Sequence, residues 1–185
     1  MTDVQTGTQT ATDWQIDTAH TQVEFAVKHM MLATVKGGLG QVTGAIHLDE
    51  RNPARSSVTA EVDAATIDTR VDQRDAHLRS ADFLDVEHFP TITFRSTWVA
   101  PAGEGRATVE GDLTIRGVTK PIVLDVTEEG RLKDPYGNDR IGFSATARLD
   151  RRDYGLLWNQ TLEAGGVLVG NEVRITIEVE ATRVG

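Results

Sequence analysis

The chain alternates apolar and polar residues over most of its length. Eight segments place an apolar or very small residue at every second position, with polar residues between them. A period of two is typical of β-strands that bury one face. The predicted buried faces run through residues 23–27, 42–48, 58–62, 92–98, 109–115, 122–126, 141–149 and 173–179.

The connections between these segments indicate how the strands pair. Several are short and contain Gly and Asp, such as EEGR at 128–131 and DPYGND at 134–139. Short connections favour antiparallel neighbours, and the strand–helix alternation of a parallel sheet is missing from the pattern. Eight antiparallel strands that share an apolar face form a barrel or a sandwich, and closure into a barrel removes exposed edges. We therefore expect an all-β, eight-stranded antiparallel barrel.

The predicted inward positions mix very large and very small side chains. The large ones are Phe25, Phe94, Trp98 and Phe143, and the small ones are Gly44, Ala60, Ser96, Gly111, Ala145 and Ala147. In one interpretation the small residues leave a cavity, since eight strands can enclose one small ligand. In the other, a large residue or a tight bend lies opposite each small one and the barrel is solid. The sequence leaves both interpretations open.

One charged segment interrupts the strands, RVDQRDAHLRSADFLDVEHFP at 70–90. Its spacing predicts a short helical insert over about 72–85, with Asp72 and Asp75 near the helix N-terminus, where acidic residues are favourable. The apolar residues of this insert are expected to pack on the barrel as a lid or plug. They are Ala76, Leu78, Phe83 and Leu84.

The ends and the length of the chain suggest one domain. Residues 1–12 are rich in Thr and Gln without periodicity, which predicts a disordered tail, and residues 13–184 fit a single domain. We see no basic and apolar leader and no stretch long enough to span a bilayer. We therefore expect a cytoplasmic protein without a transmembrane segment. The sequence leaves open whether it forms a homodimer.

Composition and motifs limit the chemistry. The net charge of −9 argues against nucleic acid and against an anionic membrane as partner. Cysteine is absent, which excludes disulfides and Cys-ligated metals. His77 and His88 flank three carboxylates at 82, 85 and 87, but the spacing matches no known metal motif. We predict no metal, no cofactor and no enzymatic activity, because a nucleophile elbow, P-loop and dinucleotide motif are all missing.

Two polar features stand at strand ends. His29 continues the inward positions of its strand and stands at the strand end, so it either bonds a backbone carbonyl or contacts a ligand head group. Arg151, Arg152 and Asp153 are interpreted as an ion-pair corner at a strand end.

Five stretches together resemble the YceI-like family. They are residues 14–30 (WQIDTAHTQVEFAVKHM), 68–96, 111–126, 141–156 (IGFSATARLDRRDYGL) and 169–182. The resemblance implies a lipocalin-like barrel with a helical segment and a long apolar pocket for an amphiphilic lipid. Ligands of the family include polyisoprenoids, prenylated quinone-like molecules and fatty-acid-like amphiphiles.

The inward positions and the loop at 156–171, which we expect to cover the mouth opposite the helical insert, give a set of candidate ligand-binding residues. They are Phe25, Val27, His29, Ile46, Ala60, Phe83, Phe94, Trp98, Leu113, Phe143, Ala145, Leu157, Trp158 and Ile175. The leading hypothesis is that the barrel binds, sequesters or carries a long-chain isoprenoid or acyl lipid. The alternatives are an enzyme that acts on a prenylated or quinone-like substrate through His29 or His77, and a solid barrel that serves as an interaction module.

Overall fold

The computed structural model describes residues 11–185. Most of the predicted N-terminal tail, residues 1–10, lies outside this range. Ala11 and Thr12, which we assigned to the tail, belong instead to the first strand. The strands are β1 (Ala11–Ile16), β2 (Gln22–His29), β3 (Ala33–Leu39), β4 (Thr43–Asp49), β5 (Ser57–Asp63), β6 (Thr91–Pro101), β7 (Arg106–Ile115), β8 (Val118–Lys133), β9 (Asp139–Asp150) and β10 (Val169–Arg183).

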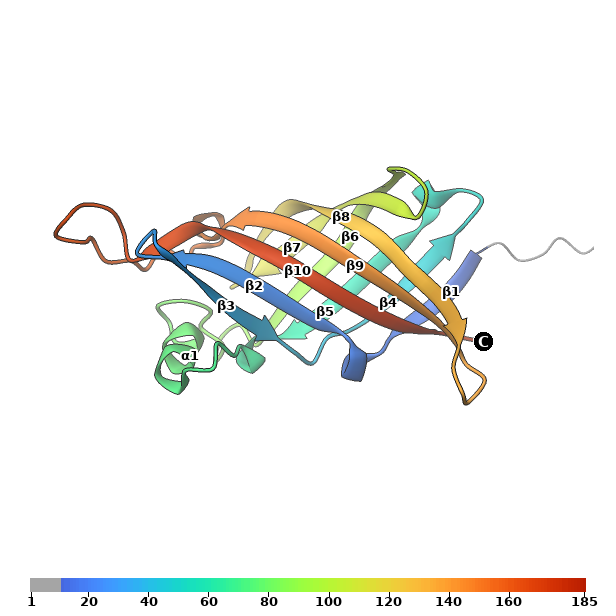
Figure 1. The fold of residues 1–185 in the computed structure, drawn as a ribbon, viewed down its shortest axis with the longest axis horizontal. Helices are drawn as coiled ribbons and strands as arrows, with labels where there is room; N and C mark the ends of the chain where they lie inside the picture. The colour runs from blue at the N-terminus through green and yellow to red at the C-terminus, as the bar shows by residue number, and fades with distance from the viewer. Residues whose placement is uncertain (1–10) are drawn as a thin grey trace, which may run out of the picture.

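The ten strand segments close into a barrel with eight strand positions (Figure 1). β1 and β2 follow one another along a single position, because both pair with the long strand β10. β3 and β4 share the next position, since β3 pairs with β2 and β4 with β1. All neighbouring strands are antiparallel, and the pairing of β1 with both β4 and β10 closes the ring. The predicted eight-stranded antiparallel barrel is confirmed.

Two strand segments were missing from the sequence prediction. β1 offers Trp14 and Ile16 as its buried residues, too few to establish an alternation. β3 contains Gly37 and Gly38 where the pattern needs side chains. Gly37 pairs with Phe25, and a Cβ at this glycine would lie 2.4 Å from the Phe25 ring. The glycine therefore accommodates an aromatic ring from the neighbouring strand.

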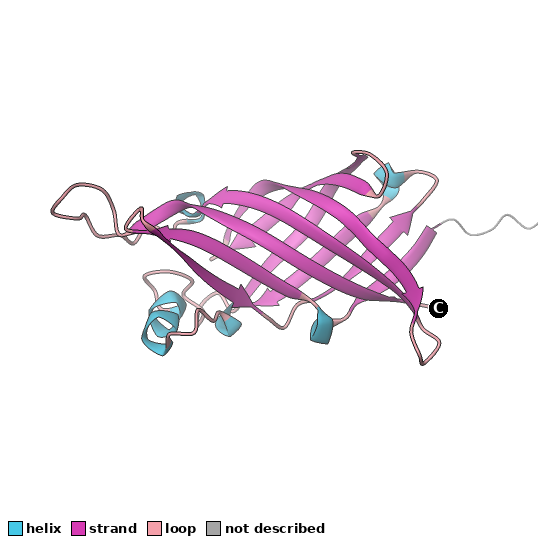
Figure 2. Cartoon of the chain, in the orientation of Figure 1, coloured by secondary structure: helices cyan, strands magenta, loops and turns pink. Residues whose placement is uncertain are grey.

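The helical parts are small and lie in the connections, while strands form the wall (Figure 2). They are η1 (Thr18–His20), η2 (Pro53–Arg55), η3 (Ala64–Thr66), α1 (Asp72–Arg79) and η4 (Arg151–Tyr154). Within residues 11–185, no helix has the length and apolar character needed to cross a bilayer.

The predicted insert is helical over a shorter range than 72–85. α1 ends at Arg79, and turns that begin at Ser80 carry the chain to β6. Leu78, Phe83 and Leu84 pack on the barrel as expected, but Ala76 is exposed and takes no part. The turn after α1, rather than another helical turn, is what brings Phe83 and Leu84 to the barrel.

Two apolar clusters pack the ends of the barrel. The larger one joins the α1 insert to β6, β7, β8 and β9 and includes Phe83, Leu84, Leu113 and Tyr154. The smaller one lies at the opposite end, around Trp14, Ile141 and Ala181. The barrel wall between the two clusters surrounds the candidate site.

Candidate functional site

The barrel encloses a cavity of about 1100 Å³. Its walls are predominantly apolar and come from every strand position, with Phe25, Phe94, Phe143 and Ile175 among them. The lining includes members of the larger cluster and residues packed against the smaller one, such as Ile46 and Phe143, so the cavity extends along most of the barrel. Pockets for drug-sized ligands measure roughly 300–1,000 Å³. The volume is therefore suited to a ligand longer than a typical small molecule.

Most of the predicted site residues line this cavity. They are Phe25, Val27, His29, Ile46, Ala60, Phe83, Phe94, Leu113, Phe143, Ala145, Trp158 and Ile175. Their position on the cavity wall is a finding, whereas their contact with a ligand stays a prediction.

The expectation that Trp98 and Leu157 line the pocket was wrong. A bulge in β6 between Ser96 and Trp98 shifts the register, so Trp98 faces outward with 50% of its surface exposed, and Val99 takes the inward position. Leu157 is 66% exposed, because the chain after η4 is irregular and turns Leu156 and Trp158 inward instead.

The small inward residues divide into two groups. A Cβ at Gly111 would lie 2.4 Å from the Phe94 ring, so this glycine lies under an aromatic side chain and leaves no space. Ala60 and Ala145 border the cavity directly. At Gly111 a large residue does lie against the small one, as one of the two interpretations proposed. The barrel as a whole is nevertheless hollow. The solid-barrel alternative is contradicted.

An aromatic cluster stands where the insert meets the loop after η4. The His77 ring lies edge-on to Phe83 and to Trp158, with centroid distances of 5.1 and 4.6 Å. Phe83 and Trp158 are 5.5 Å apart, and all three side chains border the cavity. His77 Nε2 lies 2.8 Å from Asp82 Oδ2, which fixes the ring from its outer side. These residues line the α1 end of the cavity. The loop after η4 therefore lies at the same mouth as the insert, and the prediction that it covers the opposite mouth was wrong.

A buried polar network holds α1 at this mouth. Asp75 is almost fully buried and accepts hydrogen bonds from the backbone N–H and the hydroxyl of Thr69, at 2.8 and 2.5 Å. Burial alone would raise the pKa of Asp75, but the Thr69 hydrogen bonds and the nearby Arg79 and Arg74 hold this pKa below its ordinary value. Arg74 donates to the Thr69 hydroxyl and carbonyl, and it also borders the cavity. A guanidinium therefore lies at the cavity mouth, a feature that the strand alternation could not reveal.

Arg151 anchors the loop on the other side of the mouth. It is buried and donates to the carbonyls of Gly170, Leu156, Trp158 and Val169 over 2.6–3.2 Å. Burial lowers its pKa, partly offset by the charge of Asp150. Our interpretation of an ion-pair corner was wrong for Arg151 and holds only for its neighbour Arg152, which pairs with Asp150.

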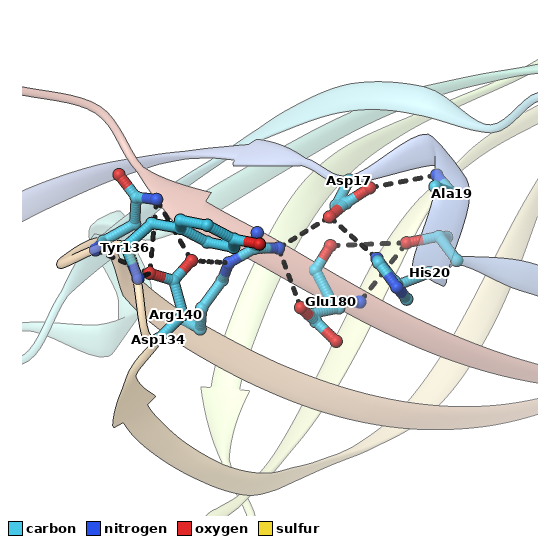
Figure 3. Close-up of polar contacts among 9 residues, drawn as sticks. Asp17, Ala19, His20, Asp134, Tyr136, Arg140 and Glu180 are labelled. Carbon is cyan, nitrogen blue, oxygen red and sulfur yellow. Dashed lines mark hydrogen bonds and ion pairs between the residues drawn. The ribbon is translucent and has the colours of Figure 1, made fainter.

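Among the described residues, one set of three side chains could hold a metal ion: Asp17, His20 and Glu180 (Figure 3). The guanidinium of Arg140 already lies there, donating from Nη1 to Asp17 at 2.6 Å and to Glu180 at 2.8 Å. Its positive charge supplies what an ion would supply, which makes the group a structural network. His77 and His88, the histidines considered from the sequence, each pair separately with one aspartate.

Sequences similar to this chain include bacterial UPF0312 proteins. One from Vibrio cholerae is 42% identical over 148 residues, which cover 79% of this chain and 78% of the relative. Another from Serratia proteamaculans is 36% identical over 179 residues, covering 96% and 90%.

Solved structures of similar proteins share the barrel. The Campylobacter jejuni YCEI protein matches with a TM-score of 0.71 and 28% identity, covering 85% of this chain and 90% of its own. Burkholderia cenocepacia BcnA matches with a TM-score of 0.79 and 23% identity, covering 90% and 99%. A polyisoprenoid binding domain from Saccharophagus degradans matches with a TM-score of 0.65 and 13% identity, covering 92% and 98%. The last two show a common fold. A family model described as the YceI-like domain matches residues 14–181, and the chain therefore belongs to the YceI-like family.

Proposed function

We propose that this protein binds a long-chain isoprenoid or acyl amphiphile, with its apolar chain inside the barrel. The observation that carries the proposal is the apolar cavity of about 1100 Å³. Among proteins with this fold, the Saccharophagus degradans domain is described as polyisoprenoid binding. That description is consistent with a chain-shaped ligand here.

The energetics favour long ligands. Each methylene removed from water contributes about 0.8 kcal/mol, so ten contribute on the order of 8 kcal/mol. Loss of translational, rotational and chain freedom opposes binding by roughly 4–15 kcal/mol. A short chain leaves little net affinity, whereas a chain that fills the cavity retains a surplus.

In this proposal the polar end of the ligand lies at the α1 mouth. His29, Arg74 and His77 border the cavity there and offer nitrogen donors to a head group. Asp75 and Thr69 orient Arg74, and Asp82 orients His77. A head group with oxygen acceptors matches these donors.

The test is a chain-length series on delipidated protein. Isoprenoid alcohols and fatty acids of increasing length are titrated by tryptophan fluorescence, and the organic extract of the purified protein is analysed by mass spectrometry. Affinity should rise steeply with chain length, and C8-length analogues should bind poorly. An affinity that stays flat along the series would contradict burial of the chain as the source of binding.

The enzyme alternative has one supporting observation, the His77–Asp82 pair beside the cavity. A carboxylate-oriented imidazole is a common acid–base arrangement. Recovery of a bound prenylated or quinone-like substrate in chemically changed form, dependent on His77, would support it over simple binding. The cytoplasmic location stays a prediction, and the oligomeric state stays open.

A further inference from the structure

The hairpin tip between β2 and β3 exposes three consecutive apolar residues, Met30, Met31 and Leu32. Met31 is 60% and Leu32 82% exposed, and Met30 is also open to solvent. Single exposed apolar residues are ordinary on a protein surface, but three in a row at a projecting tip are not.

The backbone of this tip makes the choice of residues more unusual. Met30 and Met31 have φ values of 52° and 60°, and the N–H of Leu32 donates to the carbonyl of His29 at 3.0 Å. These features define a type I′ turn, whose two central positions favour Asn-Gly. Methionine in the left-handed region is strained, and such strain is concentrated at functional positions. A polar Asn-Gly turn would fit the same hairpin without this strain, yet the chain has an apolar turn.

The tip adjoins the mouth of the cavity. His29, the residue before Met30, borders the cavity, and so does Leu168, whose carbonyl accepts the N–H of Met30 at 2.8 Å. Two more exposed apolar side chains, Val71 before α1 and Leu157 after η4, belong to segments at the same end of the barrel (Figure 1). Exposed apolar side chains therefore lie on three segments at this end of the barrel.

The local charge of the tip is opposite to that of the chain. Residues 28–36 read KHMMLATVK, with two lysines and no acidic residue, whereas the whole chain carries −9. Lys28 and Lys36 are exposed, and neither pairs with a carboxylate among residues 11–185. Apolar side chains flanked by lysines are typical of segments that enter the interface of a bilayer.

From these observations we infer that residues 28–36 dock the barrel mouth on a lipid bilayer, so that a chain passes between membrane and cavity without crossing water. The partner is the bilayer surface, with Met31 and Leu32 among the acyl chains and the lysines at anionic head groups. This inference rests on the proposed lipid binding. It names the bilayer as the source of the ligand. The net charge of the chain opposes lasting attachment to an anionic surface, so the contact is reversible.

The experiment is flotation of the full chain with vesicles of phosphatidylcholine, with and without phosphatidylglycerol. Leu32→Ser should lower the partition coefficient of the protein onto vesicles roughly tenfold, which is equivalent to about 1.4 kcal/mol. The matched control is Leu132→Ser, which removes a leucine that is 64% exposed on β8, near the turn at the other end of the barrel, and should leave vesicle binding unchanged. Lys28→Gln with Lys36→Gln should weaken binding only to the vesicles that contain phosphatidylglycerol.

A second variant separates docking from stability. Met30→Asn with Met31→Gly supplies the residues that the turn prefers, so it should raise the melting temperature while vesicle binding falls. Neither methionine borders the cavity, so a lipid added from ethanol should bind this variant as it binds the unmodified protein.

The two proposals can fail separately. Vesicle binding that is undetectable for the unmodified protein, or that is equal in Leu32→Ser and Leu132→Ser, would overturn the docking proposal. Lipid binding from ethanol is decided by the cavity and would be unaffected by that result.

Discussion

The ring of His77 stands edge-on to the indole of Trp158, with centroids 4.6 Å apart and planes at 88°. His77 belongs to α1. Trp158 belongs to the loop after η4, and Arg151 anchors this loop by donating to the carbonyl of Trp158. The contact thus joins the two segments that close the α1 mouth. A ligand that enters at this mouth passes this pair of side chains, which we call the gate.

Removing the indole should open this gate. We expect Trp158→Ala to speed both association and dissociation of a long-chain ligand by several-fold, with a smaller change in Kd, because the mouth widens while most of the cavity wall is unchanged. Stopped-flow exchange of a fluorescent fatty acid measures both rates. Trp98→Ala is the control, since this tryptophan lies on the outer wall and should leave both rates unaltered. Unchanged exchange in Trp158→Ala would mean that the ligand enters elsewhere.

His29 should discriminate between ligands by their polar end. It borders the cavity at the end of β2, where one hydrogen bond to a head group contributes about 1 kcal/mol. We expect His29→Gln to weaken binding of a polar-headed ligand about fivefold and to spare the corresponding hydrocarbon. Calorimetric or fluorescence titration of the two ligands decides this, with His88→Gln, an exposed histidine paired to Asp85, as control. Equal losses for both ligands would assign His29 a structural role.

The network at the other barrel end should set part of the acid stability. The hydrogen bonds from His20 and Arg140 lower the pKa of Asp17 from 3.8 to about 2. A carboxylate whose pKa is lower in the folded state stabilises the fold above its unfolded pKa and loses this contribution as the pH falls through the folded pKa. We therefore expect Arg140→Gln to lower the free energy of unfolding above about pH 4, with the difference from the unmodified protein shrinking as the pH falls toward 2.

Urea unfolding across this pH range measures the difference. Arg148→Gln is the control, because Arg148 makes only an exposed ion pair with Glu172 at 3.6 Å and should have little effect at any pH. A loss of stability in Arg140→Gln that is constant from pH 7 to pH 2 would show that the carboxylates are not the partners through which Arg140 acts.

The strand pattern predicted the barrel because each strand buries one face, and that constraint is local to the sequence. It failed where contacts between distant segments set the geometry. The bulge in β6 moves Trp98 outside, and a single bulge reverses every later position. Gly37 interrupts the alternation of its strand in the sequence. Only the strand register shows that the Phe25 ring lies against it. The pairing of Asp17 with Arg140 spans 123 positions and leaves no local pattern.

The size of the cavity is another property that alternation cannot give. Ala145 and Ala147 lie on the same face of β9, and the sequence treats them alike. The structure separates them: Ala145 borders the cavity, whereas Ala147 is buried in the packed cluster near Tyr154 and Leu156. Identical substitutions at the two positions therefore test the cavity directly.

We expect Ala147→Leu to destabilise the delipidated protein by about 1–3 kcal/mol, because the added carbons overpack a filled core. Ala145→Leu should cost much less stability, since its added carbons enter open space, but they occupy volume that the ligand chain needs. Long-chain affinity should then fall in Ala145→Leu, and the loss should be larger for the longest ligands. Urea unfolding and ligand titration on the same delipidated samples give both quantities. If Ala145→Leu unfolds as easily as Ala147→Leu and still binds the longest chain normally, the space beside Ala145 is not where the ligand lies.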